Sequence, residues 1–321
     1  MRVGYSLGPL LSASEVLTCA RLADAKDDVD SVWVPESWGR ESFATLGAIS
    51  QITKRVRLGT SIVSIFSRTP ATVAMGAATL DMLSGNRAVI GVGSSTEAIV
   101  ENWHGAKFEK PVSRMREFVE CLNLMTSGER VNYDGKFFRA SNFKMLNSPT
   151  RKHVPVFMAA VNKKMVSLAC ELADGVILYL RPLDELKKTV AEIRRASAGR
   201  QFEIALSLIC AVSDDDPEDA RRRAAKTLAF YVAVGKYYSK FLAENGFAAE
   251  VEKIKQEYGK GGNGTNAVTD RMLDSLSVCG TRQDCRKALS RFVEAGVTLP
   301  IMQVNPVKDA EGSFREMLST F

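Results

Sequence analysis

Short apolar segments and helical segments alternate along nearly the whole chain, and this alternation limits the fold more than any other feature of the sequence. Eight runs rich in β-branched and apolar residues are each followed by a pattern of helical period. Such alternation is typical of a parallel sheet whose strands are joined by helices. Eight strands favour closure into a (β/α)8 TIM barrel of the α/β class over an open, doubly wound sheet. The predicted strands are Arg2–Leu7, Ser31–Pro35, Val56–Ile62, Ala88–Val92, Val154–Ala159, Gly175–Leu180, Glu203–Val212 and Leu299–Val304.

Two segments depart from this pattern. Arg130–Thr150 contains Tyr133–Lys136 (YDGK), which is typical of a hairpin turn, and Glu244–Asp274 is polar and includes a run of glycines. We expect both, at about residues 130–150 and 244–274, to be insertions in βα loops of a single domain over residues 1–321. The predicted helices lie near Ser14–Asp27, Glu41–Thr53, Pro70–Leu83, Ser113–Thr126, Lys164–Ala173, Leu183–Ala198 and Asp216–Asn245, with later ones from Asp284 and from Lys308.

The composition excludes several classes of protein. A net charge of +6, dispersed along the chain, is too small to indicate a nucleic-acid surface. No apolar run approaches the roughly 20 residues that span a bilayer, so we predict a cytoplasmic protein without a membrane partner. The six cysteines lack a CxxC pair and are predicted to be reduced core residues. The two histidines, His104 and His153, are too few for the metal centre of a barrel hydrolase, so no metal is predicted.

The segment Leu80–Ser95 (LDMLSGNRAVIGVGSS) indicates a helix end, a turn, a buried strand and a loop able to hold a ligand. Gly91 and Gly93 allow the backbone to approach a ligand closely. The third glycine of a dinucleotide-binding fingerprint would fall on Thr96, so this loop is not such a fingerprint.

The residues that follow the strands form the active-site face of a closed barrel. Glu36 follows the second strand, where partial burial could raise its pKa for proton transfer; an ion pair or a helix cap is the alternative interpretation. The segment Ala160–Lys164 places backbone N–H groups and two lysines at a helix start, which suits a phosphate, although the lysines are also typical of a solvated surface.

The chain lacks the parts of nucleophilic catalysis. It has no GxSxG segment, and no cysteine has a histidine beside it. A barrel of this kind must therefore recruit its chemistry, and a cofactor with a phosphate tail would supply it.

Seven segments together resemble one family, and they cover nearly the whole chain. They are Val32–Ser50, Arg55–Ser95, Lys110–Glu117, Tyr133–Arg139, Pro155–Ala160, Leu172–Leu178 and Cys279–Val297. The family is the bacterial luciferase-like superfamily and, within it, the oxidoreductases that use the deazaflavin coenzyme F420. The second segment, where LGT and a later R(S/T)P precede a helix and GRA follows it, is similar to that of methylenetetrahydromethanopterin reductases.

This resemblance implies a TIM-type barrel, a homodimer or higher homo-oligomer, and hydride transfer between C5 of the deazaflavin and a small substrate stacked on its face. Glu36 matches the family's acidic residue after the second strand and is assigned, with Ser37, to the catalytic site. Ser37 stands where several members have histidine, so Glu36 or a water molecule would have to act as the base.

The resemblance also implies a set of cofactor-binding residues. Ser61 and Ile62 match a non-prolyl cis peptide behind the deazaflavin ring, so we predict a cis bond there. The other implied contacts are Gly93, Ser94 and Ser95 beside the ring and ribityl chain, Glu97 at an acidic position, and Ala160, Val161, Asn162 and Lys163 at the phosphate.

Two other functions remain open. The same barrel occurs in FMN-dependent monooxygenases, and a non-catalytic flavin-binding protein of this fold is a further alternative. The substrate is expected to contact the two insertions. Tyr231, Tyr237 and Tyr238 are candidates for lining its pocket, with core or dimer contacts as the alternative.

Overall fold

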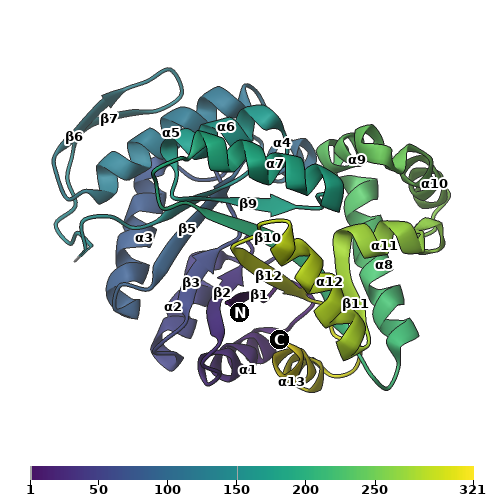
Figure 1. Ribbon diagram of the computed structural model, residues 1–321. Helices are drawn as coiled ribbons and strands as arrows, with labels where there is room; N and C mark the ends of the chain where they lie inside the picture. The colour runs from purple at the N-terminus through teal and green to yellow at the C-terminus, as the bar shows by residue number, and fades with distance from the viewer. Residues whose placement is uncertain (1, 150) are drawn as a thin grey trace.

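The computed structural model describes residues 2–149 and 151–321, and a closed barrel of parallel strands lies at its centre (Figure 1). The closing contact is the parallel pairing of β9 with β10, in which Glu203 lies opposite Gly175. Closure excludes the doubly wound alternative and confirms the eight predicted strands as the barrel strands. Around the ring they are β10 (Glu203–Val212), β12 (Leu299–Val304), β1 (Val3–Ser6), β2 (Val29–Val34), β3 (Arg57–Thr60), β5 (Ala88–Gly93), β8 (Val156–Ala159) and β9 (Gly175–Tyr179).

Two further strands extend the barrel at its carboxyl end. β4 (Val63–Ser64) pairs with the end of β5, and β11 (Ser277–Gly280) pairs with the last residues of β10. β11 was not expected from the sequence. Its four residues, SVCG, are too few to show a hydrophobic period. They can pair with β10 because β10 is ten residues long and extends beyond the end of β9.

Helices surround the barrel, and most lie within a few residues of their predicted positions. Local signals account for their ends, as in α12, where Thr281 and Asp284 form a capping box. The outer helices are α1 (Ala13–Asp24), α2 (Ser42–Ile52), α3 (Pro70–Ser84), α5 (Pro111–Thr126), α6 (Lys163–Leu172), α7 (Leu183–Ala196), α12 (Arg282–Glu294) and α13 (Ala310–Thr320), with the short α4 (Glu97–His104) after β5. In the part of the chain that is described, none of the helices has the length and hydropathy needed to cross a bilayer.

The first predicted insertion is a two-stranded antiparallel hairpin, β6 (Val131–Asp134) and β7 (Arg139–Phe143). It packs against α5, where the rings of Phe118 and Phe138 meet edge to face and the Tyr133 hydroxyl donates to Glu120. The YDGK turn is therefore confirmed. In Figure 1 the hairpin lies far from the second insertion.

The second insertion is helical, which the polar composition of residues 244–274 did not predict. Its helices share a hydrophobic cluster with the ends of β10 and β11, and this cluster includes Leu228, Ile254 and Met272. The predicted helix Asp216–Asn245 is interrupted at Gly235, where a Cβ atom would lie 2.6 Å from the carbonyl oxygen of Tyr231. The elements are α8 (Pro217–Val234), α9 (Lys236–Leu242), the π-helical η1 (Ala243–Phe247), α10 (Ala248–Gly259), the 3₁₀ turn η2 (Thr265–Ala267) and α11 (Asp270–Leu276).

Large side chains fill the barrel interior and form the floor under its carboxyl end. Trp33 and Phe157 are buried with ring centroids 5.8 Å apart, and Ile62 and Ala159 pack on this cluster from one side. Gly59 makes room for the indole, because a Cβ atom there would lie 2.2 Å from it. The interior is therefore a packed core, and the open space lies beyond it.

Candidate active site

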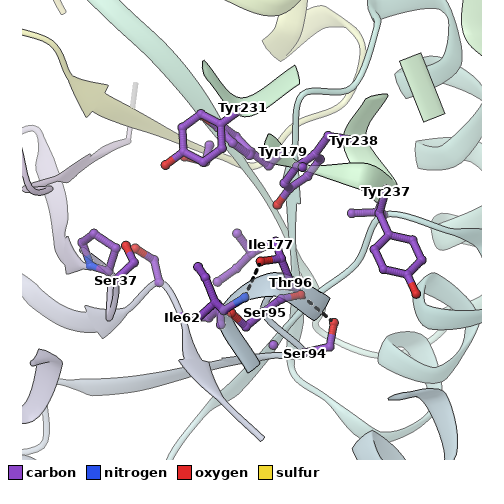
Figure 2. Close-up of a pocket in the computed structure, with 18 of the residues that line it drawn as sticks. Ser37, Ile62, Ser94, Ser95, Thr96, Ile177, Tyr179, Tyr231, Tyr237 and Tyr238 are labelled. Atoms are coloured by element: carbon purple, nitrogen blue, oxygen red, sulfur yellow. Dashed lines mark hydrogen bonds between the residues drawn. The ribbon is translucent and has the colours of Figure 1, made fainter. Parts of the chain in front are cut away.

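A cavity of about 270 Å³ opens at the carboxyl ends of the barrel strands (Figure 2). Its lining comes from loops after β2, β3, β5 and β8 and from the helical insertion, so segments far apart in the sequence meet here. The predicted site residues that line it are Glu36, Ser37, Ser61, Ile62, Gly93, Ser94, Ser95, Ala160, Val161 and Asn162.

Ile62 forms one wall of this cavity. The Ser61–Ile62 peptide bond is cis, as predicted, and the Ile62 side chain lies against the loop after β5. A Cβ atom on Gly93 would lie 2.6 Å from Ile62 Cγ1. Glycine at position 93 therefore lets the Ile62 side chain occupy this wall.

Glu36 lines the cavity but is held by an arginine. Arg68 donates from Nε and Nη2 to the two carboxylate oxygens, at 2.8 and 2.7 Å, and also bonds Glu41. The Ser42 backbone N–H at the start of α2 donates to the same carboxylate at 3.3 Å. The hydrogen bonds with Glu36 raise the pKa of Arg68. The geometry thus matches the alternative interpretation, an ion pair and a contact at a helix start.

Two loops present polar backbone to the cavity. Ser95 adopts a left-handed backbone with φ of 59°, and the following Thr96 side chain caps α4. On the neighbouring loop, Asn162 caps α6 by accepting from the Met165 N–H at 3.0 Å. The buried Arg181 donates to the Val161 carbonyl at 2.5 Å and so holds this loop in place.

The structure does not bring two of the predicted residues into the cavity. Lys163 points outward, with an exposed side chain whose Nζ lies 3.1 Å from Glu192. Its contact with a cofactor phosphate therefore stays a prediction. Glu97 lies beside the rim in the first turn of α4 and pairs with Lys236 at 3.0 Å. Residue spacing at a helix start cannot show which way such side chains point.

Three tyrosines lie across the cavity from Ile62 (Figure 2), namely Tyr179, Tyr231 and Tyr238. Together with Gln303, which also lines the cavity and bonds Tyr179, they form one wall. Tyr231 and Tyr238 line the cavity, as the sequence analysis suggested, and so does Tyr237. Tyr179 lies near the end of the predicted strand Gly175–Leu180. No role was predicted for Gln303, because its strand carries no motif. The Tyr179 hydroxyl donates to Gln303 Oε1 at 2.8 Å.

Burial holds these tyrosines in their neutral form. Burial is the largest cause of the raised pKa at Tyr179, Tyr231 and Tyr238, and the neighbouring phenol groups add to it at Tyr179 and Tyr238. A phenol with a raised pKa donates a hydrogen bond at neutral pH and does not act as a base. This wall is therefore polar and uncharged.

Aromatic rings surround the mouth of the cavity. Trp38 meets Trp103 edge to face at 5.0 Å and Phe230 at 5.2 Å. On another side Phe108 stands 5.9 Å from Tyr237. Trp38 holds a left-handed backbone with φ of 55°, a conformation that non-glycine residues seldom adopt outside turns and functional sites.

Comparisons with known proteins agree with this architecture. A family model described as luciferase-like monooxygenase matches residues 2–299. The chain is 29% identical to the 5,10-methylenetetrahydromethanopterin reductase of Archaeoglobus fulgidus over 308 residues, which cover 93% of this chain and 92% of the relative. It is 28% identical over 333 residues to a putative coenzyme F420-dependent oxidoreductase of Mycobacterium tuberculosis, covering 94% of each chain.

A solved structure shares the fold over its full length. The coenzyme F420-dependent tetrahydromethanopterin reductase of Methanopyrus kandleri superposes with a TM-score of 0.87 at 22% identity, covering 99% of this chain and 97% of that one. Since the family match runs over nearly the whole chain, this protein belongs to the luciferase-like monooxygenase family and is an oxidoreductase of the class that uses a flavin or a deazaflavin.

Proposed function

We propose that this protein uses coenzyme F420 and transfers a hydride between the deazaflavin ring and a small organic substrate. The observation that carries the proposal is the cavity wall made by Ile62 and Gly93, which offers a flat ring an apolar support at the carboxyl end of the barrel. The similarity to an F420-dependent oxidoreductase and to methylenetetrahydromethanopterin reductases supports the same cofactor. The substrates of those relatives are not assigned to this chain.

The polar groups of the cavity fit this coenzyme. Within residues 2–149 and 151–321 no lysine or arginine lines the cavity, and the groups near a phosphate would be backbone N–H groups and the starts of α4 and α6. Such groups bind anions without a neutralising side chain. These donors suit the phosphate of such a coenzyme.

The coenzyme and the residues of the cavity would have different roles. When bound, the coenzyme supplies a hydride donor or acceptor at ring C5. Ile62 supports the ring, Ser94, Ser95 and Asn162 position the coenzyme by polar contacts, and the tyrosine wall receives the substrate. Glu36 holds Arg68 and the start of α2 beside the site. Ser37 lies at the edge of the cavity and brings no titratable group to it.

We also propose a homodimer. Three large apolar side chains on α3, Met75, Met82 and Leu83, are between 39 and 51% exposed, which suits a contact with a second copy. Sedimentation velocity tests this: a single species of twice the 35.1 kDa chain mass is expected, and a monomer at micromolar concentration contradicts it.

Fluorescence titration of the purified protein with F420 and, in parallel, with FMN tests the proposed cofactor. Saturable binding of F420 that is at least tenfold tighter than binding of FMN is expected. Tighter binding of FMN would place the protein with the monooxygenases of its family. Binding of neither would contradict the proposal.

A further inference from the structure

The side of the cavity that faces Ile62 carries only uncharged polar groups. Tyr179, Tyr231, Tyr238 and Gln303 contribute three phenol groups and one amide. Among the described residues, Glu36 is the only charged one in the lining, and both of its carboxylate oxygens bind Arg68. A charged substrate group would lose its hydration here without meeting an opposite charge, which is unfavourable.

The Tyr238 hydroxyl is the free donor in this wall. The Tyr179 hydroxyl already donates its hydrogen bond to Gln303, and Tyr231 lies next to both of these side chains. Among the described residues, by contrast, the Tyr238 hydroxyl has no hydrogen-bond partner. Figure 2 shows it directed into the cavity, towards the side where Ile62 and Ser95 lie. A hydrogen-bond donor in this position is available to a ligand.

The ring of Tyr238 is fixed in place. It meets the ring of Tyr179 edge to face, with centroids 5.5 Å apart, and lies 6.3 Å from that of Tyr231. The interruption at Gly235 allows this packing, since a Cβ atom there would lie 2.7 Å from the Tyr238 ring. A donor that is already oriented loses little entropy when it binds a ligand.

We propose that the Tyr238 hydroxyl donates a hydrogen bond to the carbonyl oxygen of an uncharged ketone or aldehyde, and that such carbonyl compounds are the substrate class. The inference rests on the proposed function, because a polarised carbonyl carbon accepts a hydride. In reduction the carbonyl carbon would gain the hydride that the reduced coenzyme gives up, the C=O π electrons would move to the oxygen, and that oxygen would take one proton from water, so the product is an alcohol. Tyr238 stays protonated because burial raises its pKa, so it polarises the carbonyl as a donor. Tyr231 and Tyr179 keep it in place.

Cyclohexanone labelled with ¹³C at the carbonyl carbon is the probe, and its infrared carbonyl stretch is the readout. A hydrogen bond from Tyr238 shifts this band to lower frequency. The band is measured with wild-type protein, Tyr238→Phe and the control Tyr258→Phe, which removes a hydroxyl from the exposed face of α10. Methylenecyclohexane, cyclohexanecarboxylate and cyclohexylammonium serve as ligands of similar shape without the neutral carbonyl.

The shifted band is expected in wild-type protein and in Tyr258→Phe and is lost in Tyr238→Phe, whose affinity for the ketone falls about fivefold to tenfold. The three comparison ligands should bind at least fivefold more weakly than the ketone. Tyr238→Phe should unfold at the same temperature as the wild type or higher, because the lost hydroxyl bonds no other group of the protein.

An unshifted band, equal affinities of wild type and Tyr238→Phe, or stronger binding of a charged ligand or of methylenecyclohexane would overturn the inference; so would the absence of saturable ketone binding. The spectra are recorded with and without F420. A Tyr238-dependent band in protein that does not bind F420 would contradict the proposed cofactor and leave the carbonyl site standing. F420 binding without a Tyr238-dependent band would support the proposed cofactor and contradict the carbonyl site.

Discussion

The two ends of the barrel handle polar groups in opposite ways. At the amino end, Arg2 and Arg57 each bind both Asp30 and Glu203, with N–O distances from 2.5 to 3.3 Å, so these four charges are paired. At the carboxyl end, none of the described residues in the wall that faces Ile62 is charged, and the Tyr238 hydroxyl has no hydrogen-bond partner among the described residues. Paired charges stabilise the fold, whereas unpaired donors in a cavity are available for a ligand. This difference indicates that the active site lies at the carboxyl end.

Backbone conformation follows the same division. Three non-glycine residues with positive φ, Trp38, Ser95 and Leu180, lie in loops at the carboxyl end. At the amino end, the turn between α3 and β5 uses Asn86, a residue type that tolerates this conformation well. Less favourable local conformations are thus accepted where they shape the cavity.

Replacing Asp30 should give the largest loss of stability. Its carboxylate is nearly buried and faces two arginines, so Asp30→Asn is expected to reduce the free energy of unfolding by about 2 kcal/mol; this is less than for a fully buried pair because Arg2 and Arg57 are partly exposed. Urea denaturation measures the loss. The control Asp134→Asn, in a fully solvated pair with Arg139, should change stability by less than about 0.5 kcal/mol. Equal effects would remove the contrast between the two pairs.

The Asp30 contribution should also depend on pH. Burial alone would raise the pKa of Asp30, but Arg57 and Arg2 outweigh it and hold the pKa below its ordinary value. A lowered pKa in the folded state means that the stabilisation is present above the unfolded pKa of about 3.9 and is lost as the pH falls through the folded value. Wild type and Asp30→Asn should therefore converge in stability below about pH 4.

Replacing Gly93 should give the largest loss of coenzyme binding. The new methyl group in Gly93→Ala would displace Ile62 from the cavity wall, and we expect F420 affinity to fall at least tenfold, about 1.4 kcal/mol. Gly47→Ala in α2 is the control, because its new methyl group meets nothing within 4 Å. An unchanged dissociation constant in Gly93→Ala would mean that this wall does not support the ring.

Glu36→Gln should have a smaller effect. The amide keeps the shape but loses the charge opposite Arg68, so stability should fall by about 1 kcal/mol while F420 affinity changes less than twofold. Denaturation and titration measure the two quantities. Glu311→Gln, in an exposed pair with Arg315, is the control. A tenfold loss of F420 affinity would assign Glu36 to the coenzyme instead of to Arg68.

At the start of α6, replacements of the adjacent residues Asn162 and Lys163 should differ in effect, and the smallest effect of all is expected for Lys163. Asn162→Ala removes the cap and should reduce stability by about 1 kcal/mol, with weaker F420 binding. Lys163→Ala should change neither quantity measurably, because this side chain points to Glu192. A salt-dependent loss of F420 affinity in Lys163→Ala would restore the lysine to the phosphate site.

The sequence predicted the barrel well because its strands are short, apolar and separated by clear turns and caps. It also predicted most of the loops around the cavity, because the Ser61–Ile62 and Gly93–Ser95 segments carry family motifs. Side-chain direction was harder. The outward turn of Lys163, the pairing of Glu36 with Arg68 and the meeting of Tyr179 with Gln303 each depend on contacts between distant segments. No local period records such contacts.

The gain in unfolding free energy on adding F420, compared between Asp30→Asn and Gly93→Ala, tests the division between the two ends most directly. At a coenzyme concentration of about 100 times the wild-type dissociation constant, the wild type should gain about 2.7 kcal/mol. Asp30→Asn should be less stable without coenzyme yet gain the same amount, whereas Gly93→Ala should gain about 1.4 kcal/mol or less. A full gain in Gly93→Ala, or a gain lost in Asp30→Asn, would contradict the account.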